Sequence, residues 1–176
     1  MTQIQCASDI SSQYLCISFE KRIWYVSSAR RFLHCLKNIS IGIASSYGKK
    51  YIHGVKNTEN YWHADHDSFL ECMADAAKSI VDHFGGKMAF VNIMKNMSVD
   101  CDCCAVAEDP KIGDIGILSS LDPVALDQAC LDLVYASDDP GKGDLIERIE
   151  SRNGVHTIEA AAAIGIGGRE YELITL

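Results

Sequence analysis

Three thiols and two carboxylates stand within five consecutive residues, Asp100-Cys101-Asp102-Cys103-Cys104. Burying so many polar groups in an apolar core is costly, so the sequence predicts a loop. In an extended segment, side chains two positions apart point to the same side. Cys101 and Cys103 can therefore bind one soft transition-metal ion, such as iron, zinc or nickel. A turn whose thiols are merely exposed or half buried is the alternative interpretation.

The other five of the eight cysteines are predicted to be free thiols in or near the core, because each has apolar neighbours. They are Cys6, Cys16, Cys35, Cys72 and Cys130. The first ten residues, MTQIQCASDI, lack the basic and apolar regions of a secretory signal, which predicts a cytoplasmic location. Disulfides are rare in that reducing compartment. The CxxCxxCxxxCP pattern is absent, so the chain has no complete ferredoxin motif for a 4Fe–4S cluster.

A segment rich in glycine and serine, residues 36–50, has a lysine near each end. Backbone amides, hydroxyls and ammonium groups can together bind an anion, which predicts a small anionic ligand. The candidate ligand-binding residues are Lys37, Asn38, Ser45, Ser46 and Lys49. The spacing differs from the GxxxxGKS/T phosphate-binding loop. A strand and turn with solvated lysines is the alternative interpretation.

Three carboxylates, Asp114, Asp122 and Asp127, are candidates for an acid or base in catalysis. Asp122 precedes Pro123, and that pair is typical of a helix start, where the aspartate caps the helix and proline occupies its first turn. Asp127 is expected either to be solvated or to face a site. The sequence alone leaves both possibilities open.

The elements that must position these residues alternate between helix and strand. Ser68 and Glu71 form a predicted capping box ahead of a helix that ends near residue 84. Apolar runs at residues 87–94 and 112–119 predict strands, and a second helix starts at Pro123. This alternation predicts an α/β fold with a mixed, largely parallel sheet flanked by helices. Ligands favour the carboxyl ends of strands in such sheets, and the cysteine loop follows the strand at 87–94.

Length and charge narrow the classes of function. A chain of 176 residues predicts one domain over residues 1–176, of which residues 1–35 are hard to assign. The net charge of −8 argues against nucleic-acid binding, which needs a basic surface. No apolar run approaches the ~18 residues of a membrane helix, so no membrane partner is expected.

Several motifs carry a resemblance to a known family. They are DCDC at 100–103, DIGILSSLDPVALD at 114–127, LKNISIG at 36–42 with a following GK at 48–49, and AIGIGGREYEL at 163–173. Residues 36–176 thereby resemble the DUF362 family, often labelled uncharacterised iron–sulfur center proteins. The resemblance implies an α/β fold without an assigned reaction. Members often carry a histidine near the position of His53, which makes His53 a candidate metal ligand beside Cys101, Cys103 and Cys104.

The chain also departs from that family. Many members carry a ferredoxin insert between the LKN segment and the DCDC loop, whereas residues 57–67 bridge this gap here. The resemblance therefore implies a shortened member and does not transfer a 4Fe–4S cluster. The chain is interpreted as a compact member, a truncated product, or one half that needs a partner, either a second copy or a redox protein.

Three functions remain open from the sequence. The first is a metal- or redox-linked enzyme that uses the Cys101 and Cys103 loop. The second is a non-enzymatic module that binds a ligand or protein and has lost its electron-transfer insert. The third is a degenerate copy with vestigial loop cysteines.

Overall fold

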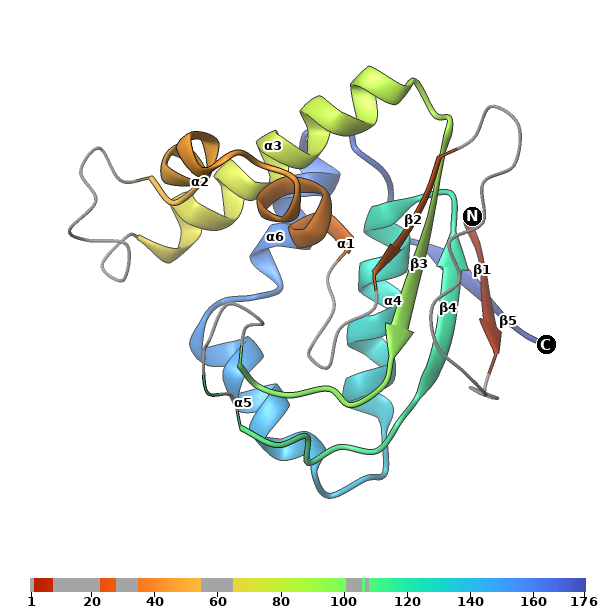
Figure 1. The fold of residues 1–176 in the computed structure, drawn as a ribbon. Coiled ribbons are helices and arrows are strands. Elements are labelled where there is room, and N and C mark those ends of the chain that lie inside the picture. The colour runs from red at the N-terminus through yellow and green to blue at the C-terminus, as the bar shows by residue number, and fades with distance from the viewer. Residues whose placement is uncertain (1, 8–22, 28–34, 55–64, 101–105, 107) are drawn as a thin grey trace.

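The computed structural model describes residues 2–7, 23–27, 35–54, 65–100, 106 and 108–176 (Figure 1). Their strands are β1 (Thr2–Ala7), β2 (Ile23–Ser27), β3 (Met88–Met94), β4 (Gly116–Ser120) and β5 (Tyr171–Thr175). Their helices are α1 (Cys35–Lys37), the π-helical segment η1 (Asn38–Gly42), α2 (Ser46–Ile52), α3 (His66–Phe84), α4 (Pro123–Ala136), α5 (Lys142–Ser151) and α6 (His156–Ala163).

The strands form one mixed sheet in the order β2-β3-β4-β1-β5. β2 pairs with β3 in parallel, and β1 pairs with β5 in parallel. β4 lies antiparallel to both β3 and β1. The predicted α/β class and mixed sheet are confirmed. Parallel pairing does not predominate among the described strands, because two of their four pairings are antiparallel.

The described helices lie on one side of this sheet, as Figure 1 shows. α4 packs directly on β3, β4, β1 and β5, and the other helices pack on α4 and on one another. α4 is therefore enclosed on most of its circumference, and Val124, Leu126 and Leu131 are all buried. A helix that is apolar nearly all round belongs in such an interior position.

The N-cap of α3 lies three residues before Ser68, the predicted cap. The cap is Asp65, whose Oδ2 accepts a hydrogen bond from the Ser68 N–H at 3.0 Å, so Ser68 is the third residue of the helix. The Glu71 side chain accepts a hydrogen bond from His156 of α6, if His156 Nε2 carries the proton. Aspartate is as good a cap as serine and stands earlier in the chain, which explains the shift. The helix ends as predicted, with Gly85 in the left-handed region at φ 55°.

Residues 36–50 are mainly helical, so the predicted strand and turn are wrong. The Ser40 hydroxyl donates to the Leu36 and Lys37 carbonyls at 2.8 and 3.0 Å, within the turn where the π-helical segment starts. Ser45 then caps α2 by accepting a hydrogen bond from the Gly48 N–H at 3.1 Å. Serine is a favoured N-cap, so Ser45 favours the start of a helix at this point of the chain.

The predicted strand at 112–119 is present only from Gly116 onward. Residues 112–115 belong to the connection that leads from β3 to β4. Within the described part of the chain, no helix has both the length and the apolar character needed to cross a bilayer.

Candidate functional site

Residues 95–115, which we call the arm, leave the sheet at the carboxyl end of β3 and return to β4. The two limbs are joined at the base, where the Asn96 N–H donates to Asp114 Oδ1 at 2.9 Å. They are joined again near the end, where the Ser98 hydroxyl donates to the Glu108 carbonyl at 2.7 Å. The Glu108 N–H also donates to Asp100 Oδ2 at 2.8 Å. These bonds bring together the two residues that flank positions 101–107.

α5 and Gly141 ahead of it contact both described limbs of the arm. Arg148 donates from one guanidinium nitrogen to the Val99 carbonyl at 3.2 Å and to Asp100 at 3.4 Å. Lys111 forms an ion pair with Asp144 of α5. Gly141 lies so close to the backbone of Lys111 that an added Cβ would collide with the Lys111 carbonyl. The arm is thus fixed to α5 by both charge and close backbone packing.

Cys101, Cys103 and Cys104 lie outside the described residues, so their role as metal ligands stays a prediction. Within the described residues, no group of three or more histidine, cysteine, aspartate or glutamate side chains is placed to hold a metal ion. The arm fixes the positions of Asp100 and Glu108 on either side of the cysteines.

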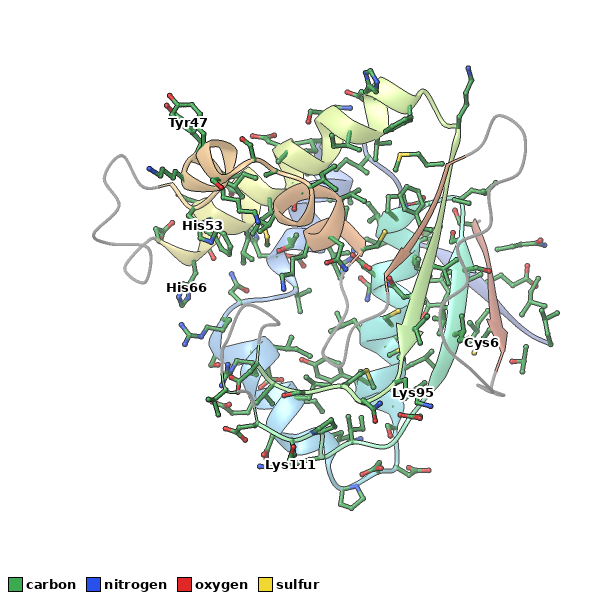
Figure 2. The ribbon with its side chains drawn as sticks, in the orientation of Figure 1. Cys6, Tyr47, His53, His66, Lys95 and Lys111 are labelled. Carbon is green, nitrogen blue, oxygen red and sulfur yellow. The ribbon has the colours of Figure 1, made fainter. Side chains whose placement is uncertain are left out.

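Asp114 is the accessible member of the three predicted acid–base carboxylates, with 42% of its side chain exposed. Besides the Asn96 N–H, it has the Lys95 ammonium 3.7 Å from Oδ2. Figure 2 shows Lys95 at the end of the sheet where the arm starts. A fixed, exposed carboxylate beside a cation can bind a substrate or exchange a proton with one.

Asp122 caps α4, as predicted. Its Oδ1 accepts hydrogen bonds from the N–H groups of Val124 and Ala125 at 2.9 and 3.1 Å. Its Oδ2 accepts from the Gly168 N–H at 2.9 Å. An added Cβ at Gly167 would collide with this carboxylate, so the glycine-rich turn before β5 is fitted closely around it.

Asp127 is fully buried, so the expectation of a solvated carboxylate is wrong. It accepts hydrogen bonds from the N–H groups of Cys35 and Leu36 at 2.6 and 2.9 Å. The Asn92 amide donates to it at 2.9 Å. Asp127 therefore binds the start of α1 to β3 and α4, and it fixes the chain directly ahead of Lys37.

Two of the predicted core thiols, Cys35 and Cys130, are buried. Burial raises the pKa of both thiols, and the nearby Asp127 carboxylate raises each pKa further. They are therefore protonated at neutral pH and poor metal ligands. Cys6 and Cys72 are half-buried free thiols, and Cys16 lies outside the described residues.

The predicted anion-binding residues are spread over three helical pieces. Lys37 ends α1, Asn38 starts η1, and Lys49 lies in the last turn of α2. The Ser45 hydroxyl accepts a hydrogen bond as the cap of α2, and Ser46 is the first residue of that helix. Binding of an anion by this set stays a prediction.

His53, the predicted additional metal ligand, follows α2. Its Nδ1 lies 2.6 Å from the Lys49 carbonyl oxygen, and its ring lies against Phe69 of α3 with 4.8 Å between ring centroids. Figure 2 shows His53 between α2 and α3, whereas Lys95 and Lys111 of the arm lie at the other end of the molecule. The ring orientation of His53 is thus set by α2 and α3.

Sequence reasoning missed the residues of α5 that support the arm. Arg148 and Asp100 are 48 positions apart, and neither belongs to a motif that links them. Lys111 and Asp144 are separated by 33 positions in the same way. Only the folded arrangement reveals these pairs.

The family model described as Domain of unknown function (DUF362) matches residues 28–132. This range is more than half of the chain, and it contains every predicted site residue from Lys37 to Asp127. No curated protein and no solved structure matches the chain. The match covers α1, the whole arm and most of α4, and the chain belongs to the DUF362 family.

Proposed function

We propose that the chain binds a thiophilic transition-metal ion, such as iron, zinc or nickel, at the end of the arm. Cys101 and Cys103 supply two thiolates, and Cys104 completes the ligand set. The observation that carries this proposal is the closure of the arm by the Ser98, Asp100 and Glu108 hydrogen bonds. Closing a short loop in advance reduces the conformational entropy that its thiolates lose when they bind a metal.

The chemistry of the donor set fits this class of metal. Thiolate ligands select zinc, iron and other soft ions over magnesium and calcium. Such an ion supplies Lewis acidity or electron transfer. On the protein side, Asp114 is fixed and exposed where the arm leaves the sheet, and it acts as the acid or base. Lys37, Asn38, Ser45, Ser46 and Lys49 bind an anionic substrate in this proposal. The proposal places the protein in the reducing cytoplasm, where its thiols stay available.

Cobalt(II) titration of anaerobically purified protein tests the metal site. Cobalt bound to thiolates absorbs strongly in the near ultraviolet, so saturable absorbance growth at one ion per chain is expected. The double variant Cys101→Ser with Cys103→Ser should lose it, because serine does not provide a thiolate. Cys72→Ser is the control, since Cys72 is a half-buried free thiol on α3.

Two results would contradict the metal site. One is the absence of iron, zinc and nickel from the purified protein together with a flat cobalt titration. The other is a titration that the double variant leaves unchanged.

Arg148 provides a second test, because it anchors Asp100 directly beside Cys101. Arg148→Gln should lower cobalt affinity by about tenfold, the usual loss when a supporting residue around a metal site is removed. Arg152→Gln is its control, since within the described residues Arg152 bonds to His66 of α3 and to no residue of the arm. Equal cobalt affinity of the two variants would show that the metal site does not depend on the support of the arm by Arg148.

A non-enzymatic binding module is the second candidate, and the Asp122 and Asp127 contacts favour it. Both carboxylates accept backbone hydrogen bonds in the structure, as helix caps do. The metal-loaded protein is tested for a change in its redox state and for conversion of a small anionic substrate. Absence of both would support the binding module over the enzyme.

A further inference from the structure

α2 carries two exposed tyrosines, Tyr47 and Tyr51, and Ile43 in the turn ahead of the helix is exposed as well. The exposed fractions of Ile43, Tyr47 and Tyr51 are 49%, 68% and 62%. Positions four apart share one side of a helix, so the two tyrosines form a continuous surface. Their hydroxyl oxygens are 2.6 Å apart and hydrogen-bonded, and their rings meet edge to face. Figure 2 shows Tyr47 pointing away from the body of the molecule.

α2 packs against α3 through the side opposite the tyrosines. Ile52 is buried against Leu70 and Met73 of α3, and Ala44 packs beside them. This inner contact and the Ser45 cap fix the helix. Among the described residues, the core contacts of α2 are therefore on this inner side. Exposed aromatic residues at neighbouring positions are typical of interaction sites.

The charge around the two tyrosines is positive in a chain whose net charge is −8. Residues 35–54 contain three lysines and no aspartate or glutamate. In the described part of the chain, no carboxylate pairs with Lys49 or Lys50, whereas Lys78, Lys95 and Lys111 each have at least one carboxylate partner. Lys50 stands three positions after Tyr47, on the same side of the helix.

We propose that this surface, formed by Ile43, Tyr47, Lys50 and Tyr51, docks an acidic segment of a partner protein. Carboxylates of the partner pair with the lysines, and its apolar side chains cover the tyrosine rings. Tyrosine is enriched in protein interfaces because it buries a large ring at a small entropic cost. Two copies meeting through this surface would place lysine against lysine, and that repulsion disfavours a symmetric dimer.

The first test uses a fluorescein-labelled amphipathic peptide rich in glutamate and leucine, followed by fluorescence anisotropy. Saturable binding is expected, with an affinity that falls as salt screens the charges. Tyr47→Ser with Tyr51→Ser should weaken binding by at least about tenfold, as loss of interface anchors does. Lys50→Gln should weaken it less and should flatten its salt dependence. Lys87→Gln is the control, because Lys87 is an exposed lysine at the far end of α3.

Other classes of ligand for this surface would give different results from an acidic peptide. Failure of the peptide to bind, or equal binding to the tyrosine variant, overturns the proposal. Tyrosine-dependent binding of a single-stranded oligonucleotide or of vesicles of phosphatidylcholine and phosphatidylserine, in preference to the peptide, overturns it as well. So does a sedimentation coefficient that shows self-association in the wild type but not in the tyrosine variant. None of the variants contains a proposed metal ligand or anion-binding residue, so this surface and the metal site succeed or fail separately.

Discussion

The Asp127 carboxylate joins three elements that lie far apart in the sequence. It is on α4, and it accepts hydrogen bonds from the first N–H groups of α1 and from Asn92 of β3. A buried carboxylate normally needs such partners, because transfer of its charge out of water is costly. Asp127 is an unusual residue in an apolar helix. The structure explains its presence there by these hydrogen bonds, without a role in a reaction.

Asp127→Asn should lower the free energy of unfolding by about 1–3 kcal/mol. The new amide nitrogen replaces an oxygen that faces N–H donors, which leaves a buried donor without an acceptor. Urea denaturation followed by circular dichroism measures the change. Asp114→Asn is the matched control, and its effect should stay within about 0.5 kcal/mol because Asp114 is exposed. Equal losses in both variants would contradict a special role for Asp127 in the core.

At the scale of elements, α5 is the support on which the arm rests. Nothing in the sequence indicates that α5 contacts the arm. That contact depends on pairs more than thirty positions apart and on a glycine that permits backbone contact. Helices and strands with strong periodicity and good caps were predictable, as α3, α4 and β3 illustrate. The contacts between elements distant in the sequence could not be predicted.

Gly141→Ala should move the arm away from α5 and destabilise the protein by about 1–3 kcal/mol, as overpacking does. Its Cβ would meet the backbone of Lys111, which cannot rotate aside as a side chain can. Gly143→Ala is the control within α5, where a Cβ meets nothing within 4 Å. Alanine there should be neutral or stabilising, because glycine is unfavourable inside helices. Thermal unfolding of both variants distinguishes these outcomes.

The contact between α3 and α6 should make stability depend on pH. The hydrogen bond between His156 and Glu71 raises the pKa of His156, and the charges of Asp67, Glu71 and Glu159 raise it further. A histidine with a raised folded pKa stabilises the fold fully below its unfolded pKa of about 6.5. This contribution disappears as the pH rises through the folded pKa. His156→Gln should therefore cost more stability at pH 6 than at pH 8, in urea titrations at both values. A cost independent of pH would contradict this linkage.

At the scale of the whole molecule, Cys35 and Cys130 mark the place where the helical layer meets the sheet. Each is 1% exposed, and the core around them reaches from Ile4 of β1 to Ala161 of α6. The sequence predicted these two as core thiols correctly. It could not show that both lie near Asp127, because Cys35 and Asp127 are 92 positions apart.

Alkylation of Cys35 and Cys130 should report on unfolding of the whole molecule. Their raised pKa and burial prevent reaction in the folded state, so they should react only as fast as the core opens. Cys72, which is half-buried on α3, should react earlier. Peptide mass spectrometry after timed iodoacetamide exposure, with urea added in steps, separates the three sites. Rapid labelling of Cys130 without urea would show that the core opens locally.

The parallel pairing of β1 with β5 has a consequence for the order of folding. Thr2 aligns with Tyr171, and the Leu176 N–H donates to the Cys6 carbonyl, so the first and last strands form one edge of the sheet. A ribosome has to synthesise the residues from β1 through β5 before this edge can form. The entropy of closing so long a loop is large, and contacts of this range slow folding. Until then β1 has only β4 as its described neighbour, and a nascent chain exposes an open strand to chaperones or to other chains.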